Sequence, residues 1–308
     1  MNKAILGVIL ALVFVSLESM QFVYFGGLFQ RMSSFHFGFL VFGLMAVGFI
    51  GWTAIENPGQ LRSAISNPAP LIGVNLCAAL TLAAYLTSVQ LVEPAITYTI
   101  SAGVMPITAY ILHKCGVREG EAMRNKLEAA GNFVLFCGIV LLTVIAVSGK
   151  SGFVRGDWTV AATGVALAIA DGVFFTWVLV YSHRLNNVGV GPGAVLGLRL
   201  PLYVAVAGGC FAVEVDQKAT LEASEIGLYV FIGLILTIPP LYALQKAVAF
   251  ISTLTISALT ALGPFFIFGL QMIEGRVEYS QATLMGLSVC FAGALFSAFG
   301  AVKAASQN

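Results

Sequence analysis

The sequence predicts an all-α membrane protein with ten transmembrane helices in two inverted five-helix repeats. Three observations lead to this fold class. Of the 308 residues, 59% are hydrophobic and only 9% are charged, whereas soluble domains carry about 25% charged residues. Apolar stretches of about 20 residues, the length that crosses a bilayer as a helix, recur along the chain. The two halves of the chain also align with each other at a nearly constant offset.

The apolar stretches are taken as helices because a helix satisfies its own backbone hydrogen bonds in lipid. Two junctions between spans, at residues 92–94 and 245–246, are very short. At each of them the two neighbouring spans can instead form one long bent helix. The ten predicted spans are 4–27, 35–55, 69–90, 94–113, 129–148, 158–181, 192–213, 226–244, 247–272 and 281–302.

Basic residues indicate the orientation of the spans. An even number of spans puts both termini on one side, and the loop 114–128 holds Lys114, Arg118, Arg124 and Lys126. Cytoplasmic loops carry the excess of Lys and Arg, so both termini are expected in the cytoplasm. The apolar stretch at 4–27 is expected to be the first span, because it is too long for a signal peptide and no clear cleavage site follows it. We expect a multi-pass protein of a bacterial-type inner membrane.

The internal repeat divides the chain into a first five-helix unit at 1–150 and a second at 151–308. Gly7 and Gly164 are 157 residues apart, Pro106 and Pro264 are 158 apart, and Gly131 and Gly286 are 155 apart. A repeat of five spans places its second copy upside down in the membrane. Inverted repeats of this kind recur in transporters that alternate between two open sides.

These features resemble the drug/metabolite transporter superfamily, in its EamA-type ten-helix branch. The matching positions are the prolines of spans four and nine, the loop acids after them, the glycines of spans five and ten, and one arginine of span seven. They are Pro106, Pro264, Glu121, Glu278, Gly131, Gly138, Gly286, Gly293 and Arg199. The chain departs from the family pattern at Val15, Phe42 and Gly172. The resemblance implies a central cavity lined by helices of both halves, and it points to the amino-acid exporters.

Three ionisable residues are predicted at bilayer depth, where each costs at least about 2.5–3.5 kcal/mol on insertion scales. They are Glu18 in span one, Asp171 in span six and Arg199 in span seven. In the repeat alignment the two acids lie one helical turn apart on equivalent faces. We expect Glu18 and Asp171 to border the cavity, where they can bind a substrate ammonium group or exchange a proton. The alternative for Asp171 is that it only neutralises Arg199.

Polar, aromatic and proline residues complete the predicted substrate site. Thr97 and Tyr98 lie in span four, and Trp177 can form an aromatic wall beside Asp171. The alternative for each is ordinary helix packing. Proline interrupts helical hydrogen bonding, so Pro106 and Pro264 are expected either as hinges or as static kinks.

The predicted function is secondary transport, most simply the export of amino acids by alternating access. The chain has no HExxH, Walker A or GxSxG motif, so we expect neither an enzyme nor a bound metal or cofactor. The absence of a basic stripe argues against nucleic acid as a partner. The expected partners are a small-molecule substrate, the lipid bilayer and, in the proton-exchange case, protons. The alternatives are a carrier of cationic drugs or polyamines, a channel, or an intramembrane enzyme.

Overall fold

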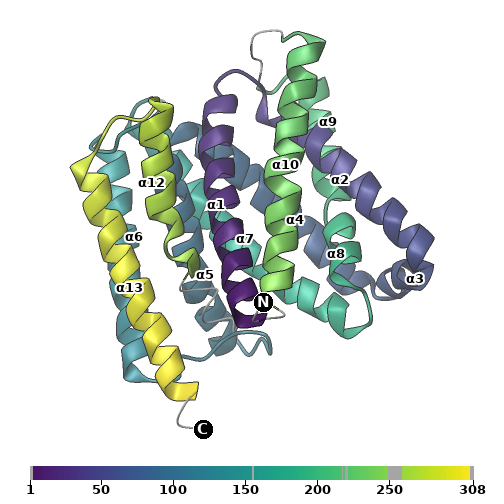
Figure 1. Ribbon diagram of the computed structural model, residues 1–308, viewed down its shortest axis with the longest axis horizontal. Helices are drawn as coiled ribbons and strands as arrows, with labels where there is room; N and C mark the ends of the chain where they lie inside the picture. The colour runs from purple at the N-terminus through teal and green to yellow at the C-terminus, as the bar shows by residue number, and fades with distance from the viewer. Residues whose placement is uncertain (1–2, 155, 217, 219–220, 249–258, 306–308) are drawn as a thin grey trace. The chain divides into compact units, whose positions relative to one another are not determined.

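The computed structural model describes residues 3–154, 156–216, 218, 221–248 and 259–305 (Figure 1). In these residues the regular secondary structure is helical, apart from an isolated antiparallel bridge between Val92 and Val154. It forms two compact units, each of which draws on both halves of the sequence. Unit 1 contains Met1–Gly27, Ser88–Ile169 and Ile235–Asn308, and unit 2 contains Leu28–Thr87 and Ala170–Leu234.

Nine stretches of helix are long and apolar enough to cross a bilayer within the described part of the chain, as a multi-pass membrane protein requires. The stretch Pro192–Ala212 comprises two shorter helices, α8 and α9. The ninth predicted span, 247–272, includes residues 249–258, which lie outside the described residues. The helices are α1 Lys3–Leu28, α2 Ser34–Glu56, α3 Pro58–Ser66, α4 Pro68–Leu91, α5 Pro94–Lys114, α6 Lys126–Val147, α7 Trp158–Asn187, α8 Pro192–Leu198, α9 Pro201–Ala212, α10 Ala223–Val248, α12 Gly263–Glu274 and α13 Gln281–Ala305.

Local sequence signals explain where several helices begin. Pro94 starts α5 and Pro192 starts α8, because the first turn of a helix needs no donor from that position. Asn125 caps α6 by accepting a hydrogen bond from the backbone N–H of Glu128 at 2.9 Å. Asp157 accepts from the Thr159 hydroxyl and from the backbone N–H groups of Thr159 and Val160 ahead of α7. The hydroxyl of Thr159, followed by the backbone N–H of Val160, holds the pKa of this exposed carboxyl below its ordinary value.

The helix bounds settle the first of the two open junctions, whereas the second continues into residues 249–258, outside the described residues. The chain leaves α4 at Leu91 and enters α5 at Pro94, so residues 92–94 separate two helices. At the other junction α10 runs on to Val248, past residues 245–246. The short helix α3 was not predicted. It lies between α2 and α4, and Pro58 is in its first turn.

In unit 1, α6 and α13 lie side by side along their length (Figure 1). Glycine makes this close approach possible. A methyl group at Gly131 would overlap the backbone of Ser297, and one at Gly293 would overlap the backbone of Leu135. The side-chain amide of Asn132 also donates to Ser297 Oγ at 3.0 Å. The glycines of these two helices therefore serve packing within the chain, as small residues do between membrane helices.

In unit 2, α2 packs against both α8 and α9 (Figure 1). A separate apolar cluster joins α4, the end of α7 and α8, and its fully buried members include Val74, Val178 and Leu185. Large apolar side chains on the outside of the helices are exposed, among them Val47 at 73% and Ile55 at 86%. Such surfaces suit contact with lipid, which is as apolar as these side chains.

Candidate functional site

Glu18 and Tyr98, both predicted as site residues, meet in unit 1. The phenol of Tyr98 on α5 donates to Glu18 Oε2 on α1 at 3.3 Å. The ring of Tyr98 is 5% exposed and meets Phe22 edge-on, with 5.0 Å between the ring centroids. Phe22 follows Glu18 by one helical turn, so α1 supplies both an acceptor and an aromatic contact to the same tyrosine. The pair places a carboxyl group and a hydroxyl together within two predicted membrane spans.

A break in the helical chain lies beside this pair. Residues 261–262 form a turn, and α12 begins at Gly263 with Pro264 in its first turn. Because proline has no N–H, Pro264 cannot donate to the carbonyl of Thr260 four residues earlier. The phenol of Tyr98 also lies 3.5 Å from that carbonyl oxygen. The tyrosine therefore lies between Glu18 and the backbone carbonyl of Thr260.

Ser19 provides a further contact between α1 and the break. Ser19 donates to Val15 O in its own helix at 2.7 Å and lies 3.5 Å from Gly263 O. A methyl group on Gly263 would lie 2.7 Å from the phenolic oxygen of Tyr98. Glycine at this position is thus what allows the tyrosine to reach both of its acceptors.

Pro106 and Pro264, predicted as a symmetric pair, have different surroundings. Pro106 lies inside α5, where it removes one backbone hydrogen bond while the helix continues on both sides. Pro264 lies instead in the first turn of α12 and is buried. The break at residues 261–262 therefore precedes Pro264. Their role as hinges stays a prediction.

Thr97 precedes Tyr98 in the chain but faces a different group of neighbours. Its hydroxyl is 3.2 Å from the hydroxyl of Ser88, which donates to Gly164 O at 2.7 Å. Thr97 is 0% exposed. These contacts join the end of α4 to α5 and to the start of α7, which is the packing alternative considered for Thr97.

The other predicted site residues, Asp171, Trp177 and Arg199, belong to unit 2. Asp171 lies on α7 and is 6% exposed. Trp177, on the same helix, stacks on Tyr181 with 5.6 Å between ring centroids and packs against the apolar cluster of α4, α7 and α8. Arg199 ends α8 just before the start of α9. Glu18 and Asp171 thus lie in different units, and a cavity shared by them stays a prediction.

Arg199 makes neither a salt bridge nor a side-chain hydrogen bond with any residue that the structure describes. The alternative in which Asp171 only neutralises Arg199 is therefore not the arrangement found in unit 2. Asn75 on α4 contacts the link that carries Arg199. Its amide nitrogen donates to Leu198 O at 2.6 Å.

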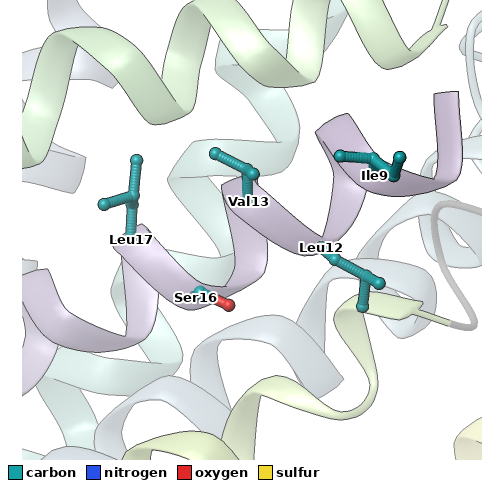
Figure 2. Close-up of a pocket in the computed structure, with 5 residues that line it drawn as sticks. All are labelled: Ile9, Leu12, Val13, Ser16 and Leu17. Carbon is teal, nitrogen blue, oxygen red and sulfur yellow. The ribbon is translucent and has the colours of Figure 1, made fainter. Parts of the chain in front are cut away.

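A depression of about 330 Å³ runs along α1 just before Glu18. Figure 2 shows Ile9, Val13 and Leu17 on one side of the helix, one turn apart, with Leu12 and Ser16 pointing to the other side. Except for the hydroxyl of Ser16, the lining side chains are aliphatic. The depression therefore offers contact to apolar groups and no charge.

Sequence reasoning missed a second polar cluster in unit 1, centred on Glu93 between α4 and α5. Glu93 is 0% exposed, and its Oε2 accepts from Gly152 N at 3.0 Å and from Thr283 Oγ1 at 2.9 Å. Its Oε1 accepts from the side-chain amide of Gln271. One carboxylate thus joins the α4–α5 junction to the loop before α7 and to α12 and α13.

The charge of Glu93 is only partly offset. Burial raises the pKa of the Glu93 carboxyl above its ordinary value, although the three hydrogen bonds and the nearby Arg276 act in the opposite direction. Arg276 forms an ion pair with Glu274 at 3.4 Å and lies over the ring of Phe153 at 4.4 Å. The only sequence signal for this cluster is an isolated acid between two apolar spans.

Together these features define a multi-pass α-helical membrane protein with polar contacts concentrated at breaks in its helices. Comparison with protein-family models and with curated proteins finds no match. Eight chains among the solved structures match. One of them, a crystal structure of a protein, is 19% identical and covers 96% of this chain and 95% of its own, with a TM-score of 0.60. This likeness shows that the two chains share a fold.

Proposed function

We propose that the protein is an inner-membrane secondary transporter of the drug/metabolite transporter type, which exports small metabolites of the amino-acid class by alternating access. The observation that carries the proposal is the contact of Glu18 with Tyr98 beside the break at residues 261–262. An ionisable residue inside a membrane marks a substrate or proton pathway by default. Transporters commonly build such sites where a membrane helix is discontinuous.

Helix pairing within each unit supports the proposal. In the repeat alignment, α5 corresponds to the segment that contains α12, α6 to α13, and α2 to the segment of α8 and α9. Each of these corresponding helices contacts its counterpart. A pseudo-two-fold axis between two inverted halves would produce such pairs, and inverted halves are the basis of alternating access in many carriers.

Glu18 is the residue best suited to a substrate ammonium group or a proton. As a carboxylate it accepts the hydrogen of Tyr98, and its negative charge attracts a cationic group. When protonated it can itself donate. The phenol, which also lies near Thr260 O, has an alternative acceptor when Glu18 changes its state.

The test is transport by purified protein in liposomes, with labelled amino acids, polyamines and quaternary amines, with and without a pH gradient. Saturable amino-acid transport that responds to the gradient is expected. Glu18→Gln should slow it at least tenfold and flatten its pH dependence. Glu121→Gln, which changes an exposed loop carboxylate of the same unit, is the matched control and should transport like the wild type.

Three results would contradict the proposal in different ways. Uptake no greater than in protein-free liposomes for every solute would exclude transport of these classes. A wild-type rate and pH profile in Glu18→Gln would remove Glu18 from the mechanism. Single-channel conductance in planar bilayers would assign the protein to channels.

A further inference from the structure

The link between α8 and α9 in unit 2 places a cation inside a predicted membrane span. Arg199 follows Pro192, the first residue of α8, by seven positions. At 1.5 Å per residue this is about 10 Å along the helix. The whole span, Pro192–Ala212, has 21 residues. Arg199 therefore lies well inside the span and not at its edge.

The helical hydrogen bonding is interrupted at this point, because the side chain of Asn75 takes the place of the bond between Leu202 N–H and Leu198 O. In an unbroken helix, Leu202 N–H would donate to Leu198 O. Here Leu198 O accepts from Asn75 Nδ2 at 2.6 Å, and Leu202 N–H donates to Asn75 Oδ1 at 3.3 Å. The same Nδ2 also donates to Leu71 O, 3.0 Å away on α4. The carboxamide of Asn75 thus holds the turn open and fixes it to α4.

Pro201 contributes to the opening. It starts α9 and has no N–H for Gly197 O. That carbonyl accepts instead from Leu200 N at 3.3 Å, a tighter three-residue turn. Arg199 lies between the two residues that Asn75 bridges. The bridge therefore determines where the backbone of Arg199 lies.

Arg199 carries a charge that the described residues do not neutralise. A guanidinium is charged at all physiological pH values, so it cannot avoid the cost of its position by losing a proton. Its planar fork of donors matches the two oxygens of a carboxylate. An unpaired arginine at an open turn of a membrane helix is thus suited to receive an anion.

We propose that Arg199 binds the carboxylate group of the transported solute, and that Asn75 is a positioning residue that holds the open turn. The inference rests on the proposed function in one respect, because it assigns the carboxylate to a solute. The binding of a carboxylate to Arg199 is itself independent of transport. The anionic oxygens of a lipid headgroup share the same chemistry, and the experiment separates the two sources.

The test uses calorimetric titration of the full-length protein in detergent, with benzoate as the carboxylate probe and benzamide as its neutral isostere. We expect saturable binding of benzoate and at least tenfold weaker binding of benzamide. Arg199→Gln should weaken benzoate binding at least tenfold, whereas Arg199→Lys should retain part of it. The matched control is Arg62→Gln on α3, an exposed arginine of the same unit, which should bind benzoate like the wild type.

Several outcomes would overturn the proposal. They are the absence of saturable benzoate binding to the wild type, equal binding of benzoate and benzamide, and unchanged binding by Arg199→Gln. Abolition of benzoate binding by added phosphatidylglycerol would assign the site to a lipid headgroup. If Arg199→Gln does not fold, the comparison of Arg199→Lys with the wild type decides, since loss of the fork alone should weaken binding.

The liposome experiment tests the proposed function and the calorimetric experiment tests the anion site, so each proposal can be contradicted without the other. Arg199-dependent binding of benzoate without transport of any solute would contradict the proposed function and leave the anion site intact. Transport that Arg199→Gln does not alter, with benzoate binding also unaltered, would contradict only the anion site.

Discussion

The hydroxyl group of Tyr98 donates to the carboxylate of Glu18 across 3.3 Å, between two helices whose contacting residues are 80 positions apart in the chain. The same hydroxyl lies 3.5 Å from the carbonyl oxygen of Thr260. A single hydrogen can satisfy only one of these acceptors at a time. We therefore expect the protonation state of Glu18 to be coupled to the hydrogen bonding of Thr260 O.

Tyr98→Phe tests this coupling, since phenylalanine keeps the ring contact with Phe22 and removes only the hydroxyl. We expect transport to fall at least tenfold. The unfolding free energy should decrease by about 0.5–1.5 kcal/mol, the net contribution of a typical hydrogen bond. Transport in liposomes and unfolding in SDS-containing mixed micelles measure the two effects. Wild-type transport by Tyr98→Phe would show that the hydroxyl is not used.

The close packing of α6 and α13 predicts that Gly293→Ala is destabilising. The added methyl group would overlap the backbone of Leu135, which cannot move aside as a flexible side chain does. Overpacking of this kind costs about 1–3 kcal/mol. SDS-induced unfolding followed by circular dichroism should show a lower midpoint.

The control for that experiment is Gly269→Ala on α12. A methyl group there would meet nothing within 4 Å, and alanine stabilises a helix relative to glycine by up to about 1 kcal/mol. Gly269→Ala should therefore unfold at the wild-type midpoint or above it. Equal midpoints for Gly293→Ala and Gly269→Ala would contradict the packing described for α6 and α13.

The burial of Glu93 predicts that the stability of the folded protein falls as pH rises. Its pKa in the folded protein is raised by burial, so the folded state binds a proton at pH values where the unfolded state has lost it. The corresponding stabilisation is complete below the ordinary glutamate pKa and is lost as pH rises through the raised value. Thermal unfolding in detergent should show this fall, and Glu93→Gln, which does not titrate, should show a smaller one.

The charge of Arg276 lowers the pKa of Glu93. Arg276→Gln should therefore raise the pKa of Glu93 further. Parallel stability curves for the wild type and Glu93→Gln would contradict the assignment.

Asn75 is predicted to stabilise unit 2 through the link between α8 and α9. Asn75→Ala removes the acceptor of Leu202 N–H and the donor to Leu198 O. Each lost hydrogen bond costs about 0.5–1.5 kcal/mol, so a drop in the unfolding midpoint is expected. Asn67→Ala is the comparison, because Asn67 donates one side-chain hydrogen bond within its local turn, to Ser63 O. A smaller effect of Asn75→Ala than of Asn67→Ala would contradict the bridging role.

Much of the helical framework could be predicted from the sequence, because the signals are local. The starts at residues 94, 158, 192 and 281 are confirmed by α5, α7, α8 and α13. Prolines at helix starts and apolar runs of membrane length give these positions without knowledge of the fold. The short helix α3 was missed because nine residues with polar members fall below the length used to recognise a span.

The contacts of the site could not be predicted in the same way. Glu18 and Tyr98 were each chosen for their chemistry, but nothing local indicates that they meet. Glu93 depends on Gln271 and Thr283, which lie 178 and 190 residues further along the chain. For Thr97 the packing alternative describes the observed contacts, because its hydroxyl pairs with that of Ser88. Pairings over such separations require the tertiary structure.

The backbone-to-backbone approach of α6 and α13 limits which parts of the molecule can move. Where Gly131 meets Ser297 and Gly293 meets Leu135, there is no intervening side chain whose rotation could accommodate sliding. In any conformational cycle we therefore expect α6 and α13 to move together as one rigid body. Distance labels placed along them should report a constant separation while other helices change position.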